Sequence, residues 1–88
     1  MSRPVAAITG ASSGIGEVFA RKLAGTHDLL LIARRRERLD TMAAEFATQH
    51  GTQVAILAAD LTNDNDLAAV AERIATEPNI DLLVNNAG

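Results

Sequence analysis

Residues 5–16 carry the sequence VAAITGASSGIG, which joins a short apolar run to three closely spaced glycines. The apolar run, residues 5–9, fits a strand that is buried on both of its faces. The glycines belong to a turn, and the turn leads into a helix. Four apolar residues recur after the turn at helical spacing and form one stripe: Ile15, Val18, Phe19 and Leu23. This stretch therefore predicts a strand, a glycine-rich turn and a helix, in that order.

The same alternation continues to the last residues of the chain. Buried strands are predicted at residues 29–33, 53–58 and 81–85, and apolar stripes within residues 39–46 and 67–74 indicate helices between them. Thr62 or Asn63 is placed to cap the last helix, and Pro78 ends it. Apolar strands that alternate with helices are parallel and joined by right-handed crossovers. We therefore expect a single α/β domain with the order β-α-β-α-β-α-β and the strand order 3-2-1-4.

Composition excludes several classes of protein. The 88 residues contain no cysteine, which excludes a disulfide scaffold and a cysteine nucleophile. The longest apolar runs have about five residues where a membrane helix needs about 20, and the formal charge of −3 argues against nucleic-acid binding. His27 and His50 stand next to predicted turns without partners at metal-ligand spacing, so we expect solvated histidines and no metal site. The sequence reads as a cytoplasmic globular unit with no membrane contact.

The glycine-rich turn predicts a phosphate site. The N-terminus of a helix presents unpaired N–H groups and a partial positive charge, and glycines let an anion approach the backbone. Gly10, Gly14 and Gly16 have the spacing Gly-x-x-x-Gly-x-Gly, which differs from the Gly-x-Gly-x-x-Gly fingerprint, and no phosphate-loop lysine follows. Ser12 and Ser13 suit hydrogen bonds to phosphate or ribose better than nucleophilic catalysis. The alternative is a turn that merely reverses the chain.

The end of the second strand indicates which dinucleotide is bound. In dinucleotide folds an acid at this point binds the ribose hydroxyls, whereas basic residues accommodate the 2′-phosphate of the phosphorylated cofactor. Here the strand ends at Ala33 and is followed by Arg34 and Arg35. We therefore expect NADP(H), with Arg34 as the main contact and Arg35 as the second. Arg36 and Arg38 fall within the next helix and fit a solvated face.

Polar residues also follow the third and fourth strands. Ligands of open parallel sheets lie beyond the carboxyl ends of the strands, where the strand order reverses. Asp60 would accept a hydrogen bond from an adenine amine there, or it would serve as a turn or capping residue. Asn85 fits a tie between strand ends, and Asn86 fits a cofactor contact.

Three motifs together closely resemble the short-chain dehydrogenase/reductase family: residues 9–16 (TGASSGIG), Asp60-Leu61, and residues 85–88 (NNAG). The resemblance spans the whole chain. It implies a Rossmann-type doubly wound parallel sheet, present as its N-terminal half, with residues 1–88 as a dinucleotide-binding half-domain. It also implies that the backbone around Ser13, Gly14 and Ile15 holds the phosphates. Asp60 and Leu61 would then flank the adenine, and Asn86, Ala87 and Gly88 would pass near the adenosine ribose.

The resemblance stops short of the catalytic residues. Family members are much longer and catalyse hydride transfer with a serine and a Tyr-x-x-x-Lys pair downstream of the NNAG motif, whereas this chain has no tyrosine and Lys22 as its only lysine. We therefore expect the 88 residues to bind the cofactor and to turn nothing over. The alternative function is a non-catalytic assembly module. Its fourth strand would pair with a second copy or with a complementary C-terminal half.

Overall fold

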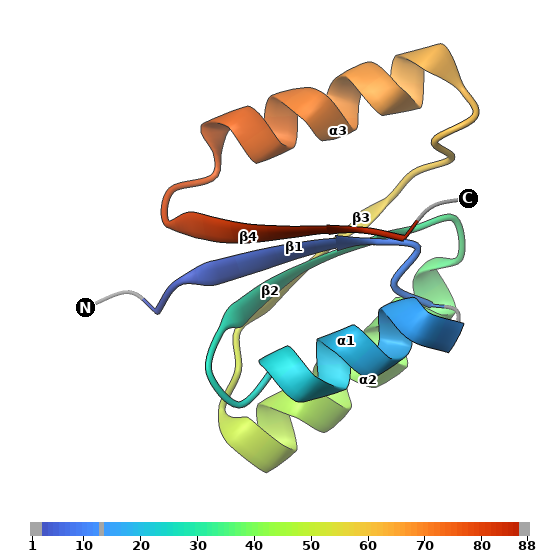
Figure 1. Cartoon of the computed structure of the whole chain (residues 1–88). Helices are drawn as coiled ribbons and strands as arrows, with labels where there is room; N and C mark the ends of the chain where they lie inside the picture. Colours follow the sequence, from blue (N-terminus) through green and yellow to red (C-terminus); the bar gives the residue numbers. More distant parts are fainter. Residues whose placement is uncertain (1–2, 13, 87–88) are drawn as a thin grey trace.

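A computed structural model describes residues 3–12 and 14–86, in which strands and helices alternate (Figure 1). The elements agree with the predicted order, with strand bounds that differ by at most one residue. They are β1 (Val5–Thr9), α1 (Gly14–Leu23), β2 (Asp28–Ala33), α2 (Arg36–His50), β3 (Val54–Ala58), α3 (Asp64–Thr76) and β4 (Ile80–Asn85). None of these helices is long and apolar enough to cross a membrane.

The strands form one parallel sheet in the order β3-β2-β1-β4, which confirms the predicted topology. β1 lies in the middle, with Ala6 opposite Leu29 of β2 on one side and Leu82 of β4 on the other. Figure 1 shows α1 and α2 on one face of the sheet and α3 on the other. All strands run the same way, so their carboxyl ends, and the polar residues that follow them, lie at one edge.

The face under α1 and α2 holds the larger part of the core. Phe46, Leu39 and Met42 of α2 are almost completely buried there against strand residues such as Ile8 and Leu31. Ionic contacts tie the two helices together on the outside, because Glu17 of α1 accepts hydrogen bonds from Arg38 and Arg21, and Arg21 also reaches Glu45 at 2.6 Å. α1 and α2 therefore form one continuous layer.

The small residues of α1 face the sheet, and of its larger apolar residues only Leu23 packs against the core. Gly16 and Ala20 are buried, whereas Ile15, Val18 and Phe19 are 64%, 51% and 41% exposed. Small side chains let a helix approach a strand closely, and α1 uses this close approach to bring its first turn beside the end of β1. The stripe that the sequence indicates therefore exists, but most of it points away from the core.

The face under α3 is covered by one helix. Its buried residues are small in number and come mostly from the strands: Ala7, Leu30, Ile32, Ala59 and Val70. Asn63 is the N-cap of α3, because its side-chain oxygen accepts hydrogen bonds from the N–H groups of Asn65 and Asp66 at 2.9 and 3.1 Å. Of the two predicted caps, Asn63 is therefore the one that the structure uses.

The prediction for His27 is wrong. Its side chain is 16% exposed and is held between Asp81 of β4, with Nε2 3.1 Å from Oδ1, and Thr26, with Nδ1 2.8 Å from Oγ1. β4 shifts its register against β1 between Ile80 and Leu82, so Asp81 is the extra residue of an irregularity in the strand. Such irregularities re-aim a side chain, which is why the sequence spacing did not indicate the contact. His50, by contrast, is exposed at the end of α2, as expected.

Candidate functional site

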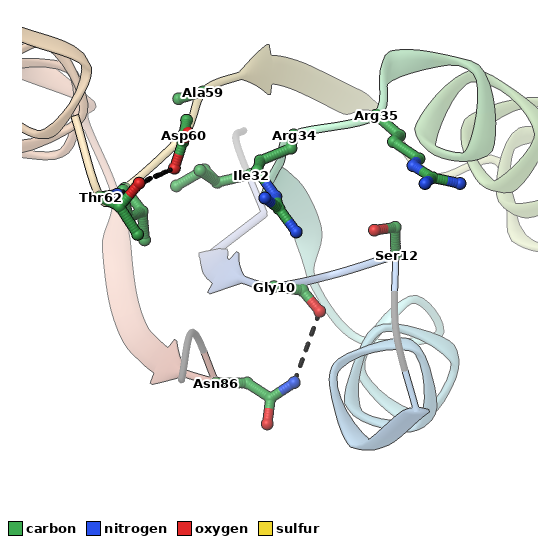
Figure 2. A pocket seen from close by; sticks show the side chains of 10 residues that line it. Gly10, Ser12, Ile32, Arg34, Arg35, Ala59, Asp60, Thr62 and Asn86 are labelled. Carbon is green, nitrogen blue, oxygen red and sulfur yellow. Dashed lines mark hydrogen bonds between the residues drawn. The ribbon is translucent and has the colours of Figure 1, made fainter.

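A cavity of about 620 Å³ lies beyond the carboxyl ends of the strands (Figure 2). Loops that follow three different strands, together with the residue after β4, contribute to its lining. The lining residues are Gly10, Ser12, Ile32, Arg34, Arg35, Ala59, Asp60, Leu61, Thr62 and Asn86. A second hollow of about 340 Å³ lies at the opposite, amino-terminal ends of the strands and contains none of the predicted site residues.

The glycine-rich turn has the conformation that its glycines permit. Gly10 and Gly14 have φ angles of 62° and 36°, in the left-handed region that side chains disfavour. A Cβ atom at Gly16 would lie 2.2 Å from the carbonyl oxygen of Gly10 and 2.8 Å from Nδ2 of Asn86. Only glycine therefore lets α1 begin so close to β1, and its N-terminus lies beside the cavity as a consequence.

Hydrogen bonds between the ends of β1 and β4 fix this edge of the sheet. The Thr9 hydroxyl donates to Oδ1 of Asn85 at 3.0 Å and accepts a hydrogen bond from the Asn86 N–H at 2.9 Å. Nδ2 of Asn86 donates to the Gly10 carbonyl oxygen at 3.4 Å. Asn85 therefore ties the strand ends together, as the sequence analysis suggested, and Asn86 connects β4 to the glycine-rich turn.

The arginines divide into paired and unpaired side chains. Five of them form ion pairs within 4.0 Å: Arg3 with Asp28, Arg21 with Glu17 and Glu45, Arg36 with Asp40, Arg38 with Glu17, and Arg73 with Glu77. Arg34 and Arg35 are exposed and make no such pair with any residue that the structure describes. Figure 2 shows Arg34 directed into the cavity toward Gly10, while Arg35 lies toward the Ser12 side. The cavity is therefore lined by two arginines that have no carboxylate within 4.0 Å among the described residues.

Asp60 has a turn role as well as a place in the cavity. One oxygen, Oδ1, accepts hydrogen bonds from the Thr62 hydroxyl at 2.6 Å and from the Thr62 N–H at 2.9 Å. These two bonds, with a smaller contribution from the charge of Arg34, hold the pKa of the Asp60 carboxyl below its ordinary value. Asp60 is therefore an ionised acceptor at the rim of the cavity.

The structure brings most of the predicted cofactor residues together. Seven of them line the cavity: Gly10, Ser12, Arg34, Arg35, Asp60, Leu61 and Asn86. Gly14, Ile15 and Gly16 lie in the first turn of α1, behind this lining. Ser13, Ala87 and Gly88 fall outside the described residues.

Sequence reasoning missed three lining residues as site residues. Ile32 lies near the end of β2, Ala59 directly follows β3, and the sequence suggested only a helix cap for Thr62. Each lies within two residues of Arg34 or Asp60, and this closeness in the sequence is the signal that could have found them. Among the described residues, no group of three or more histidine, aspartate or glutamate side chains is arranged to hold a metal ion.

Comparison with known sequences identifies relatives over almost the whole chain. The short chain dehydrogenase family matches residues 4–88. The fatty acyl-CoA reductase of Acinetobacter baylyi is 44% identical over 87 residues, a match that covers 96% of this chain and 29% of the reductase.

Solved structures show the same arrangement of strands and helices. A short-chain dehydrogenase from Sphingobium yanoikuyae, in complex with NADPH, superposes with a TM-score of 0.93 at 49% identity and covers 97% of this chain and 34% of its own. L-sorbose reductase from Gluconobacter frateurii, complexed with NADPH and L-sorbose, has a TM-score of 0.85 at 37% identity, with 100% of this chain and 34% of its own covered. The chain thus spans about a third of the length of these relatives.

Proposed function

Since this chain belongs to the short chain dehydrogenase family, we propose that it is the NADP(H)-binding portion of an oxidoreductase that interconverts an alcohol and a carbonyl compound. Residues 1–88 form the dinucleotide-binding half-domain in this proposal. A cytoplasmic location stays a prediction from the sequence.

The unpaired arginines carry the proposal for the phosphorylated cofactor. A 2′-phosphate brings about two negative charges, and planar guanidinium groups bind its oxygens in pairs. Arg34 and Arg35 line the cavity without a carboxylate within 4.0 Å among the described residues, while the neighbouring Arg36 is paired with Asp40. Ala33, at the strand end where an acid would favour the unphosphorylated cofactor, is apolar and 6% exposed. Both observations favour NADP(H) over NAD(H).

The other contacts follow from the arrangement around the glycine-rich turn. The start of α1 offers N–H groups to the pyrophosphate, with Gly10 and Gly16 leaving the space for its approach. Asp60 keeps one carboxylate oxygen, Oδ2, outside its bonds to Thr62, and we assign that oxygen to the adenine amine, with Leu61 beside the ring. Asn86 adjoins the adenosine ribose.

Titration of the 88-residue chain with NADPH and NADH tests the proposal. We expect NADPH to bind more tightly, because only NADPH carries the 2′-phosphate. Arg34→Ala and Arg35→Ala should each weaken NADPH binding about tenfold, the size of one lost charge-assisted hydrogen bond, and should leave NADH binding nearly unchanged. Arg34→Asp should reverse the preference. Isothermal titration calorimetry measures all of these affinities directly.

Arg36→Ala is the matched control. Arg36 neighbours the proposed contacts in sequence and carries the same charge, but it pairs with Asp40 on the exposed face of α2. Removing any positive charge weakens the long-range attraction for the anionic NADPH slightly, and added salt screens this effect. Beyond that effect, Arg36→Ala should change NADPH affinity less than twofold. Equal losses for Arg34→Ala and Arg36→Ala, or an unchanged preference in Arg34→Asp, would contradict the assignment.

The chemical step is assigned to residues that these 88 do not include. Proton transfer to a carbonyl oxygen needs a donor with a tuned pKa within hydrogen-bond reach, and this sequence has no tyrosine, while Lys22 lies in α1 at the end away from the cavity. The isolated chain should therefore bind NADPH without oxidising it in the presence of carbonyl compounds. Carbonyl-dependent loss of NADPH absorbance above that of a Gly16→Val control would refute this part.

One observation favours the second candidate, an assembly module. In the described sheet β4 pairs with β1 alone, and Leu82 and Leu83 are 37% and 50% exposed. An apolar strand with an unpaired edge is a template for another chain. Sedimentation of the pure chain decides whether a second copy uses this edge, since a monomer at high micromolar concentration excludes self-assembly.

A further inference from the structure

Four charged side chains form one network between α1 and α2. Oε2 of Glu17, in α1, accepts hydrogen bonds from Nε and Nη2 of Arg21 at 3.1 and 2.9 Å, and its Oε1 accepts one from Arg38 of α2. Arg21 also reaches across to Glu45 of α2 at 2.6 Å. Glu17 therefore bonds both arginines, and its side chain, 18% exposed, is the most shielded of the four.

The network shows that α1 and α2 start at the same end of the layer. Glu17 is the fourth residue of α1, and it pairs with Arg38, the third residue of α2. Farther along both helices, Arg21 pairs with Glu45. The first turns of α1 and α2 are therefore neighbours, and the Glu17–Arg38 pair lies about one turn behind the two starts.

The proposed cofactor contacts divide between these same two helix starts. The glycine-rich turn leads into α1 and is proposed for the pyrophosphate, whereas Arg34 and Arg35 lead into α2 and are proposed for the 2′-phosphate. One molecule of NADP(H) occupies both sites at once, so its affinity depends on whether the spacing of the sites matches the ligand. A wrong spacing lowers the affinity for such a ligand but not the affinity for a ligand of one site.

The start of α2 has no side-chain cap of its own. Arg35 is its N-cap and makes no side-chain hydrogen bond to the described helix, and Arg38 in the first turn is instead bound by Glu17. Glu17 is already held by Arg21, whose guanidinium carbon lies 5.7 Å from the centre of the Phe46 ring. A side chain that is already ordered loses little further freedom on binding Arg38. The pair is therefore suited to fix the start of α2 relative to α1.

We propose that Glu17 is a positioning residue for the phosphorylated cofactor, because its ion pair with Arg38 sets the distance between the pyrophosphate site at α1 and the 2′-phosphate site at α2. The inference rests on the proposed function, since it concerns the same two sites. Glu17 is not among the described residues that line the cavity, so it acts on the ligand only through the two helices.

Three ligands of the 88-residue chain separate the spacing from the sites themselves. NADPH carries both phosphate groups, adenosine 2′-monophosphate carries only the 2′-phosphate, and ADP carries only the pyrophosphate. We expect Glu17→Gln to weaken NADPH binding about threefold to fivefold, which is as much as one exposed ion pair allows, and to change the affinity for either fragment less than about 1.5-fold. Titration followed by NMR chemical shifts measures the weak fragment affinities as well as that of NADPH.

The change of charge alone has the opposite effect. Glu17→Gln removes a negative charge, which by itself strengthens the binding of every anionic ligand, so weaker NADPH binding cannot come from long-range electrostatics. Glu45→Gln is the matched control, because it removes the same charge from the same network at a greater distance from the start of α2. NADPH affinity in Glu45→Gln should stay unchanged or rise slightly.

Arg38→Gln breaks the same pair from the side of α2. It should weaken NADPH binding more than fragment binding, and its effect on NADPH should be smaller when Glu17→Gln is already present, since the pair is then already lost. Circular dichroism checks that each variant is folded. If Glu17→Gln does not fold, Arg38→Gln decides the question, and equal losses for NADPH and both fragments in Arg38→Gln refute the inference.

Other results also overturn it. A loss in Glu17→Gln that is equal for NADPH, adenosine 2′-monophosphate and ADP would show that Glu17 supports the sites and not their distance. Unchanged NADPH affinity in Glu17→Gln, or the same loss in Glu45→Gln, would exclude a positioning role. If the unsubstituted chain binds neither NADPH nor the fragments, the proposed function itself fails, and that outcome differs from all of these.

Discussion

The two faces of the sheet are covered to different extents. On one face α1 and α2 pack side by side, joined by ion pairs, over a core that includes Phe46, Leu39 and Met42. On the other face α3 covers the strands alone, and Val70 is its one buried residue. Each face meets the same strands, so the difference comes from the helices and not from the sheet.

The two faces therefore give unequal support to the two sides of the proposed site. The glycine-rich turn and the unpaired arginines lie at the starts of α1 and α2, the helices with the denser packing beneath them. Asp60 and Thr62 lie in the loop that leads to α3, on the thinner side. The residues that we propose to bind phosphate therefore rest on the better-packed face, as precise positioning of binding groups requires.

The largest expected effect comes from adjacent leucines of β2 that point to opposite faces. Leu31 is fully buried under α1 and α2, and Leu30 is fully buried under α3. Replacement by alanine should cost about 2–5 kcal/mol at either position. Leu31→Ala should lie at the upper end, since two helices keep the cavity open, while α3 alone can settle into the space at Leu30. Urea unfolding measures both losses of stability, provided that the free energy of unfolding depends on urea concentration with the same slope in each variant. A Leu30→Ala variant that loses as much stability as Leu31→Ala would contradict the comparison.

Gly16→Ala should have the next largest effect. The new Cβ would lie 2.2 Å from the Gly10 carbonyl oxygen, so α1 must move away from β1, at a cost of about 1–3 kcal/mol for overpacking. NADPH affinity should fall as well, because the glycine-rich turn moves together with α1. Gly25→Ala is the control, since the nearest atoms to its Cβ, in His50, are 4.0 Å away. Thermal unfolding and NADPH titration measure both variants. If Gly16→Ala and Gly25→Ala lose the same amount of stability and of NADPH affinity, the close-packing argument is wrong.

The smallest expected effect is on the stability of the fold at acidic pH. Hydrogen bonds from Arg38 first and from Arg21 second hold the pKa of the Glu17 carboxyl below its ordinary value of 4.5. The stability contributed by this carboxylate is therefore present above that ordinary value and is lost as the pH falls through the lower pKa of the folded state. The wild-type melting temperature should fall more steeply than that of Glu17→Gln below about pH 4.5, and the two should converge in acid. Parallel curves would show that the ion pairs between α1 and α2 contribute nothing measurable.

Local patterns predicted the elements and the edge where the site lies. Continuous apolar strands alternating with helical stripes indicated parallel strands, and the handedness of crossovers then gave the order 3-2-1-4, which the sheet confirms. The same topology brought Gly10, Arg34, Asp60 and Asn86 to one cavity, although they are far apart in the sequence. The spacing of apolar residues and the handedness of crossovers were enough to predict this arrangement, because both depend only on neighbouring residues or on the order of whole elements.

Other features depended on particular contacts between distant residues. Helical spacing found the apolar stripe of α1 but could not tell that the small residues Gly16 and Ala20 would face the sheet. The spacing of the histidines also gave no sign that an irregularity in β4 would turn Asp81 toward His27. Both outcomes depend on how closely two backbones approach, and periodicity carries no information about that distance.

The sequence by itself determined the family, the strand order and the place of the glycine-rich turn, because these depend on residue type and spacing along the chain. Only the tertiary structure decided which arginines stay unpaired. The sequence placed Arg34 and Arg35 at a strand end and Arg36 and Arg38 in a helix, but it gave no ion-pair partner for any of them. In the structure Arg38 meets Glu17 of another helix and Arg36 meets Asp40, while the first two line the cavity. Ion pairing depends on distance in space, and the packing of α1 against α2 sets that distance for Arg38, whereas Arg36 pairs one turn along its own helix.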